Sequence, residues 1–376
     1  MKSLGLYIHI PFCVKKCNYC DFLSAPSTKQ VQTAYMDTLQ KEIEAKKAEY
    51  KDYVVDTVFI GGGTPTSVEY ESLIKVVEVV KKSFSLTKDC EITIECNPGT
   101  VTKEALVAYR DLGINRLSIG LQSADDELLK SLGRIHTYEQ FLDTYKWARE
   151  AGFENINVDI MSGLPGQSLF KYKDTLEKVI NLKVEHISSY SLIVEEGTPF
   201  YKLYEEDKLD LPDEETERDM YYLTKDMLEK AGFYRYEISN YALEDYECKH
   251  NVRYWMRKDY LGLGLGASSC INNVRYKNTE WLDEYIIENK YMEKEDVQIL
   301  SEKECMEEFM FLGLRMTNGV SKTKFMEVFG LSMDSVYGGV LTRLCDKKLI
   351  ETEGDFVRLS TLGLDVSNSV WVEFLF

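Results

Sequence analysis

The sequence is short of positive charge and has no long apolar run. It contains 45 lysines and arginines against 63 aspartates and glutamates, which gives a formal net charge of −18. A surface this acidic repels phosphate backbones, so we expect no nucleic-acid partner. No stretch reaches the ~18 consecutive apolar residues of a membrane span, and the first residues lack a secretory signal pattern. These absences predict a cytoplasmic protein without a membrane span, for which peripheral association with a membrane remains open.

The sequence also lacks the pattern of a disulfide framework. Its 9 cysteines are odd in number, and a reducing compartment disfavours disulfides. Six of them are scattered along the chain, as is typical of small buried side chains. The other three fall together in the stretch LYIHIPFCVKKCNYCDF, as Cys13, Cys17 and Cys20, and Phe22 stands where a fourth cysteine could have followed.

Three thiolates in one loop suit two kinds of metal site. A structural zinc ion needs four closed ligands, and His9 is the candidate for the fourth, although it lies within a predicted strand. A [4Fe–4S] cluster normally takes four cysteines, so three thiolates leave one iron open. An open iron can chelate the amino and carboxylate groups of S-adenosylmethionine and pass an electron to its sulfonium, which releases a 5′-deoxyadenosyl radical. The spacing alone does not decide between the two sites.

Short apolar runs alternate with amphipathic stretches over the first two-thirds of the chain. They predict strands at 6–10, 57–60, 91–95, 116–119, 157–160 and 186–191, with helices at 29–49, 67–83, 102–112, 124–150 and 168–181. This alternation is typical of βαβ units and a parallel sheet. About six units are too few for an eight-unit barrel, so we predict an α/β fold built as a partial parallel β/α barrel. Such folds carry their chemistry at the carboxyl ends of the strands.

The pattern changes in the last third of the chain. We divide the sequence into a core at 1–235, a connecting region at 236–300 and a C-terminal domain at 301–376. The last of these reads as helix, short helix, helix and two short strands, which predicts a winged-helix-like α+β module. Winged helices often bind DNA, but here Lys322 and Lys324 stand beside Glu327, so no helix is markedly basic. We expect this module to make packing or protein contacts.

Two motifs follow the second and third predicted strands. The first is GGGTPT, at 61–66, whose glycines let the backbone approach a ligand and offer it N–H and C=O groups. It lacks the Gly-Lys-Ser/Thr ending of a phosphate loop, and alone it could be a tight turn. The second is Glu95, which closes the apolar strand ITIE and suits a ribose hydroxyl or an ammonium group.

Five motifs in order resemble the radical SAM superfamily: LYIHIPFCVKKCNYC, VFIGGGTPT, ITIECNP, RLSIGLQS and NVDIMSGLPGQ. The resemblance covers about residues 4–268 and points to the branch of oxygen-independent coproporphyrinogen III oxidases and HemW-type haem chaperones. It implies a [4Fe–4S] cluster on Cys13, Cys17 and Cys20. It implies contacts to S-adenosylmethionine from six residues: Tyr7, Tyr19, Gly62, Gly63, Thr64 and Glu95. The oxidases contact a second S-adenosylmethionine through residues that match Gln122, Arg134 and Asp159, and the matches leave open whether one or two molecules bind here.

The oxidases and the haem chaperones differ in features that can be recognised in the sequence. The oxidases carry a longer N-terminal segment and a fourth cysteine two places after the third, where Phe22 stands here. The stretch HNVRYW, at 250–255, resembles the haem-associated motif HNxxYW of the chaperones. A neutral imidazole is a good axial ligand for haem iron, and aromatic rings can stack on a porphyrin. His250, Tyr254 and Trp255 are therefore candidate haem residues, with Cys248 as a competing ligand.

We therefore expect a haem chaperone with a radical SAM core, which binds haem or another porphyrin and delivers haem to respiratory proteins. The alternative is an oxygen-independent coproporphyrinogen III oxidase, which turns propionates into vinyl groups by radical oxidative decarboxylation. A third hypothesis is a protein-interaction module whose cluster is only structural. The glycine-rich turn and Glu95 count against it, because a structural cluster needs no cosubstrate pocket.

Overall fold

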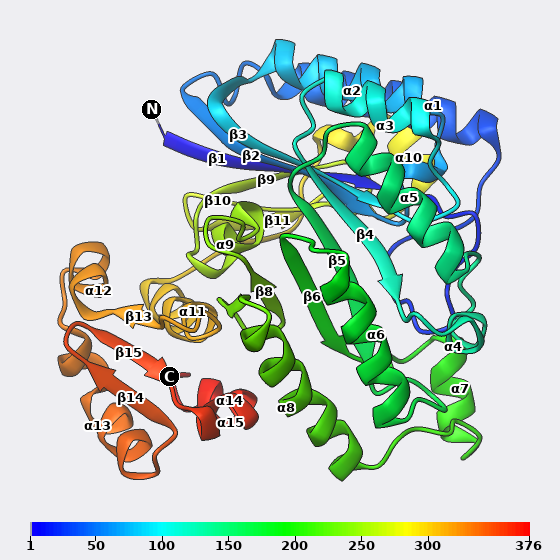
Figure 1. Ribbon diagram of the computed structural model, residues 1–376. Helices are drawn as coiled ribbons and strands as arrows, with labels where there is room; N and C mark the ends of the chain where they lie inside the picture. Colours follow the sequence, from blue (N-terminus) through cyan, green and yellow to red (C-terminus); the bar gives the residue numbers. More distant parts are fainter. Residues whose placement is uncertain (1) are drawn as a thin grey trace.

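A computed structural model describes residues 2–376 and has a twelve-stranded sheet at its centre (Figure 1). Six consecutive strands pair in parallel in chain order. They are β1 (Lys2–Ile10), β2 (Tyr53–Gly62), β3 (Ser85–Cys96), β4 (Arg116–Gln122), β5 (Ile156–Ser162) and β6 (His186–Ser191). The predicted partial β/α barrel is confirmed, and the last of these strands has the predicted bounds.

Helices cover the outer face of the parallel strands. They are α1 (Lys29–Lys46), α2 (Tyr70–Ser83), α3 (Lys103–Asp111), α4 (Asp126–Ser131), α5 (Tyr138–Glu150), α6 (Leu169–Asn181), α7 (Pro199–Glu205) and α8 (Glu214–Lys230), with a 3-10 turn at Pro65–Ser67. Every residue of β4 is buried, as expected for a strand that is covered on both faces. The predicted single helix at 124–150 is wrong, because the chain breaks it between α4 and α5.

The break between α4 and α5 has a local cause. Gly133 follows α4 with a φ of +76°, a left-handed conformation that ends a helix. Thr137 then begins α5 with a capping box, in which its hydroxyl accepts from the Gln140 N–H and the Gln140 side chain accepts from the Thr137 N–H. The apolar periodicity continues across this turn, which is why the sequence pattern predicts one helix.

Shorter strands extend the sheet at both edges. Beyond β1 lie β9 (Tyr260–Leu263), which is parallel to β1, and then the antiparallel strands β10 (Ser268–Ile271), β11 (Val274–Lys277) and β12 (Glu295–Ile299). Beyond β6 lie β8 (Asn240–Ala242) and β7 (Tyr234–Arg235). The connecting region also holds α9 (Lys249–Trp255), α10 (Leu282–Ile286) and a 3-10 turn at Lys290–Met292. No helix within residues 2–376 is long and apolar enough to cross a bilayer.

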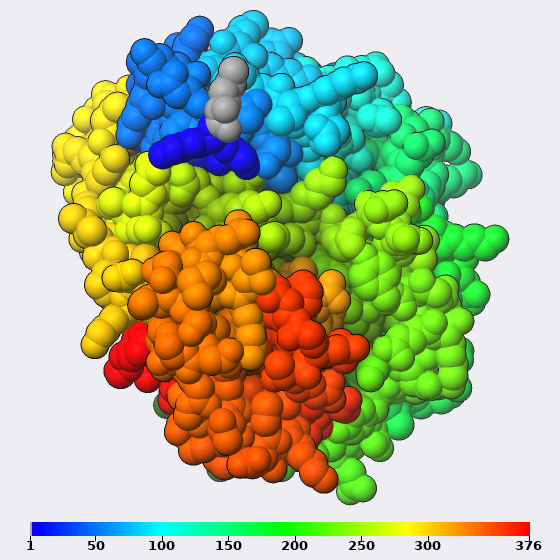
Figure 2. All heavy atoms as spheres, turned by 90° about the vertical axis from the view of Figure 1, so that its left-hand side faces the viewer, coloured from blue at the N-terminus to red at the C-terminus, as the bar shows by residue number. Residues whose placement is uncertain are grey.

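The C-terminal module has its own hydrophobic core. It consists of α11 (Glu302–Gly313), β13 (Val320–Ser321), α12 (Lys322–Phe329), α13 (Met333–Asp346), β14 (Ile350–Glu353), β15 (Phe356–Leu359), α14 (Thr361–Asp365) and α15 (Ser367–Val372). Its three strands pair in the order β13-β15-β14, which with the three preceding helices gives the predicted winged-helix-like arrangement. The module, orange to red in Figure 2, lies beside the yellow-green segment that contains α9.

One buried carboxylate joins this module to the core. Glu308 of α11 accepts from Arg257 Nε at 2.9 Å and from Arg275 Nη2 at 2.8 Å. Because Glu308 is buried and both partners come from the region at 236–300, this triad fixes the module against the extended edge of the sheet.

Candidate functional site

The three-cysteine loop joins β1 to α1 at the carboxyl end of the strand. The loop is held at both ends: Cys13 N–H donates to the Ala25 carbonyl at 3.2 Å, and Asn18 N–H donates to the Leu132 carbonyl at 2.9 Å. Cys13, Cys17 and Cys20 are all partly exposed, and burial raises the pKa of the Cys20 thiol. The loop presents these three thiols beside the glycine-rich turn.

Two of those thiols have polar neighbours from the predicted cosubstrate motifs. Thr64 Oγ1 lies 3.5 Å from Cys13 Sγ, and Arg134 Nη1 lies 3.9 Å from Cys17 Sγ. A hydroxyl and a guanidinium are donors that stabilise thiolates. The donor set therefore fits a cluster held by three thiolates, with Arg134 and Thr64 able to donate to its sulfur ligands.

His9 is already engaged and does not serve as a fourth ligand. Its Nε2 donates to the Leu23 carbonyl at 2.9 Å, and its Nδ1 lies 2.9 Å from the Tyr7 hydroxyl. Burial lowers the pKa of His9, so the ring is neutral in this position. Within residues 2–376 no three Cys, His, Asp or Glu side chains are close enough to share one metal ion. His9 instead links Tyr7 to the end of the cysteine loop.

The glycine-rich turn packs directly on that loop. Gly63 N–H donates to the Ile10 carbonyl at 2.8 Å, and Thr64 N–H donates to the Phe12 carbonyl at 2.7 Å. Gly62 has a φ of +113°, and a Cβ at this position would lie 2.5 Å from the His9 ring. A side chain at Gly63 would meet the Phe12 carbonyl oxygen at 2.7 Å. Glycine is therefore required by both conformation and space.

Glu95 is a half-buried carboxyl near the end of β3, beside the glycine-rich turn. Its Oε2 accepts from the Gly62 N–H at 3.0 Å. Burial, followed by the charge of Asp159, raises the pKa of Glu95 to about 8. The group is thus mostly protonated at neutral pH in the absence of a cationic ligand, and a bound ammonium or a pair of hydroxyls would favour its ionised form.

This pKa predicts a pH dependence of stability. The folded pKa of Glu95 lies above the ordinary value of 4.5, so its contribution is fully present below about pH 4.5 and is lost as the pH rises through about 8. We expect the free energy of unfolding to fall less steeply between pH 5 and pH 8 in Glu95→Gln than in the wild type. Urea unfolding at four pH values measures this slope, with Glu104→Gln, on exposed α3, as the control that retains it. Equal slopes for Glu95→Gln and the wild type would contradict the assignment.

Gln122 and Arg134 meet above Gly120, near the cysteine loop. Arg134 Nη2 donates to Asn97 Oδ1 at 2.9 Å and to the Gly120 carbonyl at 2.5 Å. A Cβ added at Gly120 would lie 3.0 Å from Gln122 Nε2 and 3.1 Å from Arg134 Nη2. Tyr19 is half-buried beside Arg134, and the loss of solvent around its hydroxyl raises its pKa. Three of the predicted cosubstrate residues are thus together.

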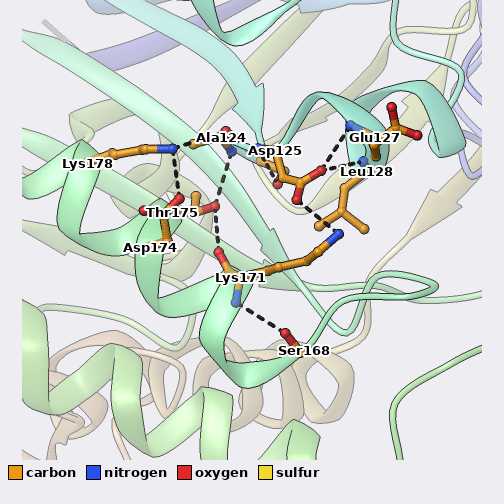
Figure 3. A network of polar contacts seen from close by, with 10 residues as sticks. Ala124, Asp125, Glu127, Leu128, Ser168, Lys171, Asp174, Thr175 and Lys178 are labelled. Atoms are coloured by element: carbon orange, nitrogen blue, oxygen red, sulfur yellow. Dashed lines mark hydrogen bonds and ion pairs between the residues drawn. The ribbon is translucent and has the colours of Figure 1, made fainter.

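A polar network fixes the chain that follows Gln122 (Figure 3). Asp125 accepts from the N–H groups of Glu127 and Leu128 at the start of α4 and pairs with Lys171 of α6 at 3.0 Å. Ala124 N–H donates to Thr175 Oγ1 of α6 at 3.1 Å. Since α6 packs on β5, this network ties the loop that follows Gln122 to the body of the barrel.

Asp159 lies apart from that pair, in the interior of the barrel. Its carboxylate accepts from Asn157 Nδ2 at 2.8 Å and from Ser118 Oγ at 3.3 Å. Burial raises its pKa. The structure therefore separates the three residues assigned to a second S-adenosylmethionine, since Asp159 lines the barrel cavity and Gln122 and Arg134 do not.

A cavity of about 230 Å³ fills the barrel interior and joins the two sets of predicted residues. It is lined by cosubstrate candidates, by three residues of the HNxxYW motif and by other side chains: Tyr7, Phe59, Glu95, Arg116, Ser118, Asn157, Asp159, Ser188, Tyr190, His250, Asn251 and Tyr254. Two predictions that were independent in the sequence, for S-adenosylmethionine and for haem, meet in one space.

The motif helix α9 lies at the amino-terminal end of β2 and β3. Glu91 of β3 accepts from the N–H groups of Lys249 and His250 at 3.0 and 3.1 Å and thus caps the helix. His250 is buried, with Nδ1 2.9 Å from Thr57 Oγ1 and Nε2 2.9 Å from the Tyr254 hydroxyl. Burial lowers the pKa of His250 to about 3, so the imidazole is neutral. A metal at Nε2 would displace the Tyr254 hydroxyl.

Cys248 and Trp255 do not face the cavity. Burial raises the pKa of Cys248 to about 12, so this thiol is protonated and is a poor ligand. Trp255 turns toward the C-terminal module, where the Arg315 guanidinium lies 4.2 Å from the centre of its ring and 5.3 Å from that of Trp371. The motif is therefore divided between the barrel interior and the domain junction.

The sequence analysis missed Arg116. This residue begins β4 and is 2% exposed, in the middle of the cavity lining. The sequence does contain a signal for this residue: the strand RLSIGLQ begins with an arginine, and no other residue in it is charged. A charged residue at the start of a buried strand is usually a surface residue, so the pattern alone would not have placed it inside.

Comparisons with known proteins agree with the motifs. The radical SAM superfamily matches residues 7–179, and the HemN C-terminal domain matches residues 300–366. The haem chaperone HemW of Bacillus subtilis is 39% identical over 100% of this chain and 99% of its own length. Those of Lactococcus lactis and Escherichia coli are 36% and 34% identical, over 100% and 97% of this chain and 98% of each relative.

A solved structure supports the fold. The coproporphyrinogen III oxidase of Escherichia coli, a radical SAM enzyme, superposes with a TM-score of 0.87 over 99% of this chain and 90% of its own. At 23% identity this likeness shows that the two chains share the fold, including the C-terminal module.

Proposed function

Since this chain belongs to the HemW family of radical SAM proteins, we propose that it is a haem chaperone that binds haem and passes it to a recipient protein. The observation that carries the proposal is the shared cavity: residues of the cosubstrate motifs and of the HNxxYW motif line the same space. A chaperone whose cosubstrate and cargo sites are joined in this way can make haem binding depend on the state of the other site.

The proposal gives each motif a role. Cys13, Cys17 and Cys20 hold a [4Fe–4S] cluster, which when bound supplies an electron to S-adenosylmethionine. Residues from the strand ends bind and orient that cosubstrate: Tyr7, Tyr19, Gly62, Gly63, Thr64, Glu95, Gln122 and Arg134. Tyr7 is held by its hydrogen bond to His9, and Glu95 supplies an acceptor at the glycine-rich turn. Asp159 lines the cavity in the barrel interior together with His250 and Tyr254.

His250 is the proposed axial ligand, and Tyr254 makes this testable. Replacing His250 with Ala removes the imidazole, and we expect haem affinity to fall at least tenfold with a changed absorbance spectrum. Replacing Tyr254 with Phe removes the hydroxyl that occupies Nε2, so it should leave haem affinity equal or higher. Titration with haem under reducing conditions measures both. Equal losses in the two variants would mean that the motif only supports the fold.

The recipient and the setting are finer parts of the proposal. We propose respiratory proteins as recipients, reached by peripheral contact with a membrane. We also propose a cytoplasmic location, because thiolates that hold a cluster must stay reduced. The divisions 1–235, 236–300 and 301–376 then correspond to a cosubstrate core, a cargo region and a contact module.

A direct test compares the two activities of this fold. The reconstituted protein receives reductant, S-adenosylmethionine and coproporphyrinogen III without oxygen, and chromatography follows protoporphyrinogen. A parallel sample is titrated with haem. We expect saturable haem binding and no product above a Cys17→Ser control. Product above that control would make the protein an oxidase despite Phe22.

A further inference from the structure

Arg116 is a buried cation without a bound partner. Its side chain is 2% exposed, and its Nε has no hydrogen-bond partner among the described residues. The guanidinium faces the cavity that also contains His250 and Asp159. A charge removed from water in this way destabilises the fold unless something pairs with it.

The carboxylates of Glu91 and Asp159, whose charges act on Arg116, accept hydrogen bonds from other groups. Although burial lowers the pKa of Arg116, nearby groups raise it overall, Cys248 first, then Glu91 and, more weakly, Asp159. Within residues 2–376 neither carboxylate forms an ion pair with it. Glu91 instead caps α9, and Asp159 accepts from Asn157 and Ser118. Arg116 therefore keeps its donors free toward the cavity, and a planar guanidinium is suited to a carboxylate.

The size of the cavity limits what can pair with Arg116. About 230 Å³ is below the 300–1,000 Å³ that is usual for a whole drug-sized ligand. A short side arm that ends in a carboxylate fits this volume as it stands, whereas ligation of haem iron by His250 requires the interior to widen around the tetrapyrrole. Tyr190 of β6 lines the cavity and is 40% exposed, so the space reaches the surface beside this strand.

We propose that Arg116 is the receptor for a carboxylate and that this carboxylate is a propionate arm of the haem cargo, inserted past Tyr190. The assignment rests on the proposed function. Asn157 and Ser118 lie beside Asp159 in the same lining and add polar contacts to the arm. The raised pKa of Glu95 keeps that neighbouring acid protonated, which lowers the repulsion of an anion. S-adenosylmethionine also has a carboxylate, and the test separates the two sources.

The test uses the reconstituted protein with haem and with haem dimethyl ester, whose propionates carry no charge. We expect the wild type to bind haem at least tenfold more tightly than the diester, since the diester offers the guanidinium no charged acceptor. Arg116→Gln should bind both equally, at the diester level. Arg343→Gln, on the exposed side of α13, should behave as the wild type.

Each other outcome overturns the inference in a distinguishable way. Equal binding of haem and diester by the wild type means that no propionate is read, although the proposed function stands. Absence of any haem binding removes both. A loss of S-adenosylmethionine affinity in Arg116→Gln, with discrimination between haem and diester unchanged, gives the carboxylate to the cosubstrate. Equal binding of haem and diester by the wild type refutes the inference even where Arg116→Gln fails to fold.

Discussion

Replacing Cys17 with Ser abolishes the visible absorbance of the cluster after anaerobic reconstitution and removes its iron. A serine hydroxyl is a far weaker ligand than a thiolate, and two thiolates from one loop leave two irons open. Cys17 is also the thiol nearest to Arg134, at 3.9 Å, so its loss removes the sulfur that this guanidinium contacts. Iron and sulfide content per chain and the visible spectrum measure the effect.

Cys345→Ser is the matched control for this variant. Cys345 is an exposed thiol of the C-terminal module, far from the loop, and its nearest polar neighbour is Thr352 Oγ1 at 3.8 Å. We expect it to keep full iron content. If Cys17→Ser also retains the cluster at wild-type stoichiometry, Cys17 is not a ligand and the three-thiolate assignment fails.

Replacing Gly62 with Ala eliminates binding of S-adenosylmethionine and lowers the free energy of unfolding by about 2 kcal/mol or more. Alanine strongly disfavours a φ of +113°, and its Cβ would lie 2.5 Å from the His9 ring. The ring can move only by breaking its hydrogen bonds to Tyr7 or Leu23. The substitution therefore disturbs the cosubstrate pocket and the end of the cysteine loop together. Equilibrium dialysis and urea unfolding measure the two effects.

Gly338→Ala is the control, because it should change the free energy of unfolding in the opposite direction. Gly338 lies in α13, and a Cβ there meets nothing within 4 Å. Because alanine favours a helix over glycine by roughly 0.5–1 kcal/mol, this variant should be more stable than the wild type and bind the cosubstrate normally. A Gly62→Ala protein that keeps normal cosubstrate affinity would show that the turn does not form the pocket.

The partial barrel could be predicted from the sequence because each of its strands is a short apolar run followed by a helix. Buried parallel strands leave this pattern regardless of what they contact. The helix at 124–150 was wrong for a related reason: apolar spacing continues across Gly133, and only the backbone conformation of that glycine and the cap at Thr137 reveal the break.

The site was predictable where its residues are neighbours in sequence or end adjacent strands. The cysteine loop and the GGGTPT turn meet because β1 and β2 are parallel and adjacent. The contacts of His250 were not predictable, since Thr57 is 193 residues away. The same holds for Arg116, whose burial depends on α9 closing the interior beneath it, and for the pairing of Trp255 with Arg315.

The two environments of α9 have a mechanical consequence. This helix has only seven residues, with His250 fixed to Thr57 inside the barrel and Trp255 stacked on Arg315 outside it. If so short a helix were to rotate as a rigid body and free the imidazole, the indole would also move across the guanidinium. Occupancy of the interior and the seating of the C-terminal module are then linked variables, and linkage acts equally in both directions. A partner protein that binds the C-terminal module would thereby raise or lower the affinity of the barrel cavity for its ligand.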